Sequence, residues 1–378
     1  KSCNLCRRTI KSTTTMKITQ QKQVGVGIIG SQFIANIHAE ALKTVADAVI
    51  VAVMSPNEAH VKTFAEQHQI PNWFTDLDAF LALDDIDMVI LGAPNYLHCE
   101  IAVKIAKAKK HVVVEKPLCL NLEEADLMIK TCKENKVKLM YAEELCFTPK
   151  YVRLKALLDE GALGYPVLFK QSEKHDGPHA DHFYDVEKSG GGVMMDMGCH
   201  AIQFFRWLNP KASIVSVYAQ MQTSVHKDKT IGDDNSVLIL EFSNGVTAIA
   251  EESWIKKGGM DDKAEIHGSE GVAYADVLQG NSILTYSEKG IGYAVEKAGN
   301  TKGWSFTMYE ELWNYGFPQE MAHFVDCVKN DRTPLVTGED GKAVLEVLFA
   351  AYASAGEGKK IKLPFKTDAK KPYLLWKK

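Results

Sequence analysis

The fold is decided by the stretch Val24-Gly-Val-Gly-Ile-Ile-Gly30-Ser-Gln-Phe-Ile-Ala35. Six residues typical of a buried strand lead into a glycine and then into a segment with helical periodicity. A literal G-x-G-x-x-G match starts at Gly25, but its first two glycines fall inside the expected strand, before the turn where a phosphate would lie. We expect backbone N–H groups at the helix start to face a dinucleotide phosphate instead, in the frame Gly30, Ser31, Gln32, Phe33 and Ile34. An ordinary tight turn is the alternative, because Gln32 replaces the glycine that usually admits close approach.

Outward from this stretch, residues 24–142 alternate short β-branched runs with amphipathic segments. This rhythm predicts a parallel sheet covered by helices. The expected strands are residues 24–29, 48–54, 88–91, 111–115 and 138–142, and the expected helices are residues 34–45, 58–68, 98–107 and 122–134. Sheets of this kind bind ligands beyond the carboxyl ends of their strands. Lys116 follows one of those ends.

The chain changes texture after a helical segment at residues 149–160. Strands then follow one another with few helices between them, which predicts a second α/β domain built on an open, mostly antiparallel sheet. These strands are expected at residues 167–171, 214–221, 237–242, 246–252 and 264–267. We predict a dinucleotide-binding domain at residues 16–145 and the second domain at residues 146–378. Residues 1–15 lack apolar periodicity and are expected to be a leader or an expression remnant.

Composition narrows the partners of the chain. Its 378 residues carry a net charge of -4 without a dense basic tract, so a nucleic-acid partner is not expected. No apolar run is long enough to span a bilayer. The eight cysteines are mostly scattered, as in proteins of the reducing cytoplasm. Only Cys3 and Cys6 form a C-x-x-C pair, and no second pair follows, so we expect no metal site.

Three polar residues suggest proton transfer. Asp196 and His200 are four residues apart, and on one helix the carboxylate would hold the imidazole while the second ring nitrogen takes a proton. Three preceding glycines would admit a ligand close to the backbone. Lys116 ends a strand in Glu-Lys-Pro. The alternative for Asp196 and His200 is a structural hydrogen bond on a helix surface. The alternative for Lys116 is an ordinary lysine at a solvent-facing strand end.

Two further segments concern ligands. His175 and His179 lie in a Gly-Pro-containing segment whose spacing fixes no single face for a metal, so we expect hydrogen bonds to a polyhydroxylated substrate, with a solvated loop as the alternative. Ser55 ends the second strand where an acidic residue often grips the ribose of NAD. NAD and NADP both remain possible. The absence of Arg or Lys just after Ser55, and the nearby Glu58, favour NAD.

Taken in order, several motifs resemble the glucose-fructose oxidoreductase, inositol dehydrogenase and MocA (Gfo/Idh/MocA) family, from Val24 to Phe365. They are Val26-Gly-Ile-Ile-Gly30, Ala93-Pro-Asn95-Tyr-Leu-His98, His111-Val-Val-Val-Glu115-Lys116-Pro117-Leu, Asp159-Glu-Gly-Ala-Leu-Gly164, Gly191-Gly-Val-Met-Met-Asp196-Met-Gly-Cys-His200 and Pro334-Leu-Val-Thr-Gly-Glu-Asp-Gly341.

The resemblance implies a Rossmann domain followed by an α/β domain whose exposed sheet face joins the subunits of a homo-oligomer. It implies an NAD(P)-dependent enzyme acting on sugars, polyols or glycosides. By resemblance, Lys116 positions the substrate hydroxyl, His200 is the base and Asp196 orients it. The resemblance also implies that the nicotinamide site is lined by Asn95, His98 and Glu115. Glu144 lies where members of the family differ by substrate.

Three functions compete at this point. The leading hypothesis is hydride transfer between a ring hydroxyl and nicotinamide. The second is a glycoside-cleaving enzyme in which transient oxidation by bound NAD permits elimination, without net reduction of the cofactor. The third is a non-catalytic dinucleotide-binding sensor, which the presence of Lys116, Asp196 and His200 disfavours.

Overall fold

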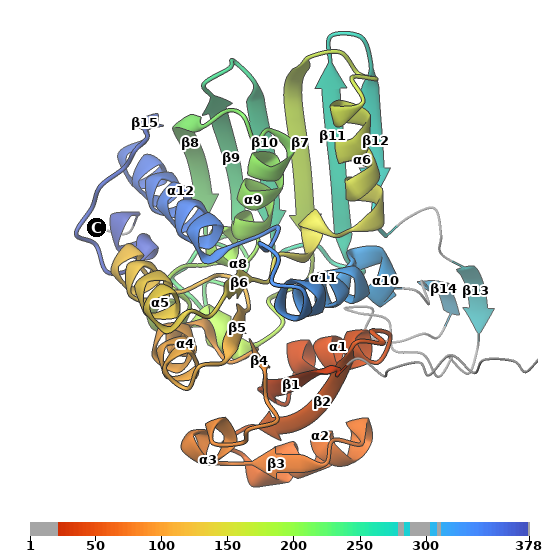
Figure 1. Cartoon of the computed structure of the whole chain (residues 1–378). Coiled ribbons are helices and arrows are strands. Elements are labelled where there is room, and N and C mark those ends of the chain that lie inside the picture. The colour runs from red at the N-terminus through yellow and green to blue at the C-terminus, as the bar shows by residue number, and fades with distance from the viewer. Residues whose placement is uncertain (1–21, 279–282, 288–302, 308–310, 377–378) are drawn as a thin grey trace, which may run out of the picture.

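A computed structural model describes residues 22–278, 283–287, 303–307 and 311–376. The expected leader at residues 1–15 and the Cys3–Cys6 pair lie outside these ranges. Two sheets dominate the described chain, and they lie one above the other in Figure 1.

The first sheet has the strand order β3-β2-β1-β4-β5-β6, and all of its pairs are parallel. Its strands are β1 (Val24–Ile29), β2 (Ala48–Met54), β3 (Asn72–Phe74), β4 (Met88–Leu91), β5 (His111–Val114) and β6 (Leu139–Tyr141). Its helices are α1 (Phe33–Leu42), α2 (Glu58–His68), α3 (Leu77–Leu81), α4 (His98–Lys107) and α5 (Leu122–Asn135). The predicted Rossmann-type parallel sheet is therefore confirmed. The prediction missed β3 and α3, which are too short to show periodicity.

The first two glycines of the literal motif serve strand packing. A Cβ atom on Gly25 would lie 1.8 Å from the Asp85 carbonyl oxygen, and one on Gly27 would lie 2.5 Å from the Phe80 ring. Both residues lie within β1, so the motif match there is a consequence of close packing in the strand, as the sequence indicated.

The second sheet has the order β12-β11-β7-β10-β9-β8-β15. Its strands are β7 (Pro166–Lys174), β8 (Ile214–Gln222), β9 (Asn235–Phe242), β10 (Thr247–Ser253), β11 (Asp261–Gly268), β12 (Val272–Asp276) and β15 (Ile361–Lys362). The β7–β10 pair is parallel and the other pairs are antiparallel, so the sheet is mixed although mostly antiparallel, as predicted. A separate pair joins β13 (Ile283–Ser287) to β14 (Gly303–Thr307).

Helices cover one face of the second sheet. Figure 1 shows α6 (Pro149–Asp159), α9 (Gly198–Leu208) and α12 (Gly338–Glu357) in front of its strands. The short helices α8 (Val193–Asp196) and α10 (Glu311–Tyr315) lie nearer the first sheet. A further short helix, α7 (Val186–Ser189), precedes α8 in the chain. No helix among the described residues lies on the opposite face in this view.

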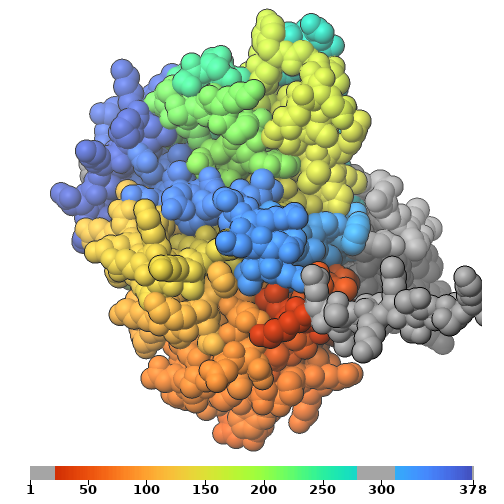
Figure 2. Space-filling model, viewed as in Figure 1, coloured from red at the N-terminus to blue at the C-terminus, as the bar shows by residue number. Residues whose placement is uncertain are grey.

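The C-terminal helices join the two sheets. Helix α11 (Phe317–Lys329) packs on α1 and β1, while α12 packs on α5 as well as on β8. The backbone N–H of Tyr141 donates to the Val336 carbonyl, which ties the edge strand β6 to the segment before α12. In Figure 2 the blue surface of these helices lies between the orange first domain and the green strands of the second. In the parts of the chain that the structure describes, no helix is long and apolar enough to cross a membrane.

Candidate active site

The first part of the site is the turn between β1 and α1. Gly30 has a φ of +114°, and a Cβ atom there would lie 2.7 Å from the Gly92 carbonyl oxygen, so this position requires glycine. Gln32 has an extended backbone (φ -115°) and needs no glycine. Its side chain makes no capping bond to α1 and the first turn holds no acidic residue, so the helix N-terminus can receive an anion. Ser31 and Phe33 are partly or largely exposed in the same turn.

Polar residues from the other strand ends surround this turn. Asn95 is buried and donates from Nδ2 to the Ser189 carbonyl, and its Oδ1 has no hydrogen-bond partner among the described residues. Glu115 accepts a 2.5 Å bond from His38 of α1. Ser55 is buried after β2. A glycine turn, an uncapped helix and an orphaned amide oxygen fit a dinucleotide, which these residues would hold.

His98 differs from its expected placement toward a nicotinamide. Its ring is buried, with Nδ1 3.0 Å from the Pro117 carbonyl oxygen and Nε2 2.8 Å from the Ala93 carbonyl oxygen. Both ring nitrogens therefore face backbone carbonyl oxygens at the strand ends. Burial lowers the pKa of His98, so the neutral ring donates to one of the two carbonyls.

Lys116 and Asp196 form the centre of the site. Lys116 follows β5, and its Nζ donates to the Asp196 Oδ1 (3.0 Å) and carbonyl oxygen (3.1 Å). Trp254 Nε1 donates to the second carboxylate oxygen at 3.1 Å. Burial works against both charged forms, but their attraction outweighs it: the pKa of Lys116 lies well above its ordinary value and that of Asp196 well below. The pair stays ionic.

The predicted Asp196–His200 pair on one helix is wrong. Asp196 ends α8 and His200 belongs to α9, with Met197 between the two helices. Because the chain does not continue as one helix, Asp196 turns to Lys116 and Trp254. His200 Nδ1 instead lies 2.6 Å from Glu143 Oε1 and 3.7 Å from Glu144 Oε2. No partner for Nε2 is found among the described residues.

Burial sets the protonation of the cluster that His200 forms with Glu143 and Glu144. It lowers the pKa of His200 to about 4, and raises the pKa of Glu143 to about 8 and that of Glu144 to about 7. The carboxyl groups therefore take up protons near neutral pH, where ordinary carboxyl groups are ionised.

The glycines before α8 pack against protein. A Cβ atom on Gly192 would lie 1.9 Å from the Asp233 carbonyl oxygen, and one on Gly191 would lie 2.1 Å from the Tyr352 hydroxyl. The Gly192 N–H donates to both Asp233 and Tyr352. These glycines were predicted to admit a ligand close to the backbone. Instead, Asp233 and Tyr352 make this close approach, and their contacts fix the start of α8.

The loop after β7 brings the two domains together. His175 is buried and its Nδ1 lies 2.6 Å from the Gly177 carbonyl oxygen. The His179 ring packs on His175, and it stacks on Phe33 with ring centroids 4.7 Å apart. The loop therefore covers the turn between β1 and α1, and it is packed against the protein and not solvated.

One group among the described residues has the ligand spacing of a metal site. Ligand atoms of Glu143, Cys199 and His200 lie within 4.8 Å of one another. The Cys199 Sγ donates to the Asp196 carbonyl oxygen, and burial raises the pKa of this thiol well above its ordinary value. A buried neutral thiol is a poor ligand for a cation.

The roles of Glu143 and Trp254 were not predicted from the sequence. The two residues lie 57 and 58 positions from their partners, His200 and Asp196, so no local spacing could connect them. The one available signal was a pair of acidic residues directly after an apolar strand, Glu143 and Glu144.

Comparisons with known proteins agree with this geometry. A model described as an oxidoreductase family with an NAD-binding Rossmann fold matches residues 24–143, and the GFO/IDH/MocA C-terminal domain matches residues 151–274. Myo-inositol 2-dehydrogenase of Thermotoga maritima is 29% identical over 343 residues, which cover 89% of this chain and 98% of that protein. The scyllo-inositol 2-dehydrogenase (NAD(+)) of Bacillus subtilis is 28% identical, covering 93% and 99%.

A solved structure extends the likeness to three dimensions. GenD2 from gentamicin A biosynthesis, in complex with NAD, is 30% identical, with a TM-score of 0.85 over 91% of this chain and 97% of that one. The chain belongs to the Gfo/Idh/MocA family of NAD-binding oxidoreductases.

Proposed function

We propose that this protein moves hydride between a ring hydroxyl of a sugar, glycoside or polyol and a nicotinamide cofactor. The observation that carries the proposal is the meeting of Lys116, Asp196 and His200 beyond the carboxyl ends of the Rossmann strands. The substrate class follows from relatives named as dehydrogenases of inositols and, at 22% identity, of D-apiose.

Each of the three residues has a distinct part in the proposal. The Lys116 ammonium donates to the substrate oxygen and positions it, while Asp196 and Trp254 hold that ammonium in place. His200 Nε2 takes the hydroxyl proton during oxidation and returns it during reduction. Glu143, in place of Asp196, orients the ring through Nδ1. A nicotinamide, when bound, supplies the hydride acceptor.

The cofactor site extends from the α1 turn to the β5 end. We assign dinucleotide contacts to Gly30, Ser31, Gln32, Phe33 and Ile34, with Ser55, Asn95, Glu115 and Lys116. NAD is proposed over NADP, because no Arg or Lys follows Ser55 within the next four residues to bind a 2′-phosphate. Substrate contacts are assigned to Lys116, Glu144, His175, His179, Asp196 and His200.

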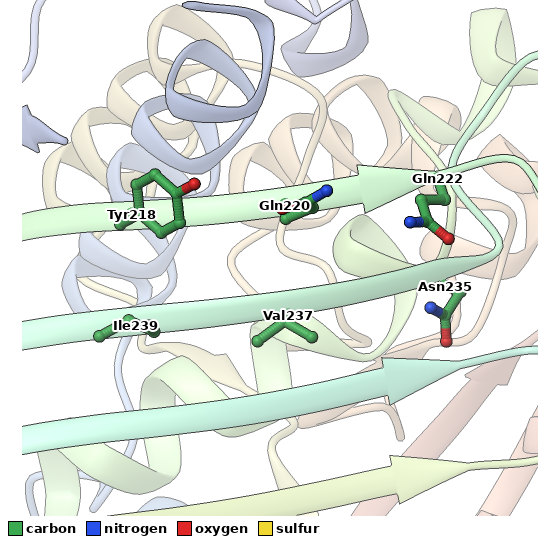
Figure 3. A pocket seen from close by; sticks show the side chains of 6 residues that line it. All are labelled: Tyr218, Gln220, Gln222, Asn235, Val237 and Ile239. Carbon is green, nitrogen blue, oxygen red and sulfur yellow. The ribbon is translucent and has the colours of Figure 1, made fainter. Parts of the chain in front are cut away.

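The open face of the second sheet is proposed as the interface of a homo-oligomer. Figure 3 shows side chains of β8 and β9 lining a pocket on this face: Tyr218, Gln220, Gln222, Asn235, Val237 and Ile239. Tyr218 and Val237 are more than one-third exposed there, and burial of such apolar side chains by a second copy would stabilise an oligomer, while the amides of Gln220, Gln222 and Asn235 offer hydrogen bonds across the interface.

Two further proposals concern organisation and location. We place the domain boundary between residues 145 and 146, where β6 has ended and α6 has not begun. We propose a cytoplasmic location, supported by the six described cysteines, all of them free and buried.

One observation favours a second function. The 2,7-anhydro-N-acetylneuraminate hydratase of Mediterraneibacter gnavus is 26% identical over 375 residues, and its name is not that of a dehydrogenase. Elimination after transient oxidation is therefore the alternative, and it predicts consumption of glycosides without net reduced cofactor.

The test is absorbance of reduced nicotinamide with NAD and NADP, offered against sugars, polyols and glycosides. Lys116→Ala and His200→Ala are each expected to lower turnover by about 10²-fold or more, because both residues act on the reacting hydroxyl. Dinucleotide binding is expected to be kept in His200→Ala, because His200 is not among the assigned cofactor contacts. Lys104→Ala is the matched control, since this lysine lies on α4 and pairs with Glu100. Full turnover in either site variant refutes the role given to that residue.

A further inference from the structure

A row of three buried carboxyl groups crosses the second sheet. Glu252 of β10 lies opposite Glu173 of β7, and Glu173 lies opposite Asp262 of β11. All three side chains are at most 5% exposed and belong to the buried, helix-covered face of the sheet. Like charges on directly opposed strand positions destabilise a sheet unless something compensates them.

Among the described residues, the Tyr151 hydroxyl and Gln171 Nε2 both donate to Asp262 Oδ1. Within the same described part of the chain, both oxygens of Glu252, the Oε2 of Glu173 and the Oδ2 of Asp262 are buried without a hydrogen-bond partner. Burial raises the pKa of Glu252 well above its ordinary value, and the Glu173 backbone N–H acts against this rise without reaching hydrogen-bond geometry. Lys174 also acts on Glu252, although its ammonium binds Glu251 on the exposed face.

The nearby bases are already taken by other acids. Lys116 binds Asp196, His38 binds Glu115 and His200 binds Glu143. Among the residues described, no ion pair reaches Glu173, Glu252 or Asp262. Glu320 of α11 adds a further carboxyl group with both oxygens buried and unpartnered. Acidic groups therefore outnumber basic groups around this part of the site.

The row adjoins the catalytic centre. Trp254, which donates to Asp196, follows Glu252 by two residues on the same face of the chain. On the other side, Glu173 precedes His175 by two residues at the end of β7, and His175 is one of the substrate positions proposed above. The charges of Lys116 and Glu144 also act on Glu173. The row therefore lies next to the proposed site.

The chemistry of the row selects one ligand. A buried carboxylate without a partner is unfavourable, and a positive partner offsets this cost. Adjacent strands lie about 4.8 Å apart, so one small cation can meet acceptors from neighbouring strands. An ammonium group offers three N–H donors and no acceptor. The oxygens of the row do not converge as metal ligands do: the described group with that spacing is Glu143, Cys199 and His200.

We infer that the substrate carries a protonated amine, as in an amino sugar or an aminocyclitol, and that Glu252, Glu173 and Asp262 bind this ammonium. The inference rests on the proposed function, because it assigns the substrate class of the same site. Burial raises the pKa of all three carboxyl groups, to about 7 for Asp262, so binding of the ammonium also releases protons from the row.

Calorimetry of the full chain with NAD tests the inference. The probes are matched amine and hydroxyl pairs: glucosamine with glucose, glucamine with sorbitol, and Tris with pentaerythritol. We expect the amine of at least one pair to bind tenfold more tightly than its partner, and repetition in buffers of different ionisation enthalpy is expected to show proton release. Equal affinities in every pair, or binding of no amine, overturn the inference.

Variants locate the effect. Glu252→Gln is expected to reduce the preference for the amine tenfold, because the amide keeps the shape of the side chain and removes its charge. Asp262→Asn is the second variant, should Glu252→Gln fold poorly. Glu251→Gln is the matched control, since this neighbour lies on the exposed face of β10. A preference that survives in both Glu252→Gln and Asp262→Asn overturns the inference.

The two proposals fail in different ways. Turnover of neutral sugars or polyols without any preference for amines refutes the amine inference and leaves the proposed function in place. Tight binding of amines without reduction of NAD by any compound refutes the proposed function and leaves the amine site in place.

Discussion

The proton shared by Glu143 and His200 decides what the imidazole offers a substrate. When Glu143 is protonated, its Oε1–H donates to Nδ1 and the ring proton is on Nε2. When Glu143 is ionised, Nδ1–H donates to the carboxylate and Nε2 presents a lone pair. Because burial raises the pKa of Glu143 to about 8, the base form becomes dominant above that pH.

A pH profile tests this pair. We expect kcat/KM for oxidation to rise as the pH increases through about 8, because ionised Glu143 turns His200 into a base. Glu143→Gln is expected to abolish this limb of the profile while binding of NAD stays unchanged, since an amide does not titrate. If the rise of kcat/KM keeps its position on the pH axis in Glu143→Gln, another titrating group is responsible for it.

At the scale of elements, the sequence predicted what depends on local periodicity. Helices α2 and α4 have the expected bounds, and the five predicted strands of the first sheet lie within a residue of theirs. The break at Met197 (φ -113°, ψ -32°) was not predicted, because Val193–Leu208 contains no proline that would end a helix there. That break turns Asp196 toward Lys116, so the site residues were identified while their pairing was not.

Gly192 tests how firmly this break is held. Gly192→Ala is expected to destabilise the fold by about 1–3 kcal/mol or more, because its Cβ atom would lie within 3 Å of the Asp233 backbone. The free energy of unfolding in urea measures this. Gly245→Ala is the control: it has no atom within 4 Å and a φ of +87°, so only backbone strain of about 1–2 kcal/mol is expected. Equal losses would show that the contact with Asp233 is not tight.

At the scale of the whole molecule, the buried acids set an unusual dependence of stability on pH. Glu143, Glu144 and Asp262 have pKa values of about 8, 7 and 7 when folded, and about 4 is ordinary when unfolded. Between pH 4 and 8 the folded state therefore binds more protons, and these groups make stability fall as the pH rises. We expect the Tm of the ligand-free protein to fall between pH 6 and 9 in calorimetry at constant ionic strength. A Tm that rises over this range contradicts the assigned pKa shifts.

Assembly is the second prediction at this scale. Val237→Arg is expected to lower the mass measured by light scattering to that of the monomer, because a buried unpaired charge would face the second copy. Leu127→Arg is the matched control, since Leu127 is an exposed apolar residue on α5, away from the sheet. An unchanged mass in Val237→Arg excludes this face as the interface.

The position of α11 and α12 has a consequence for synthesis on the ribosome. The helices that cover α1, β1 and α5 come from residues 317–357, long after the first sheet is complete. At about 5–20 residues per second, the first sheet waits about 10–40 s for its complete cover after residue 143 has been made. During this interval the nascent chain exposes apolar surface, so a chaperone that shields it would raise the yield of folded protein.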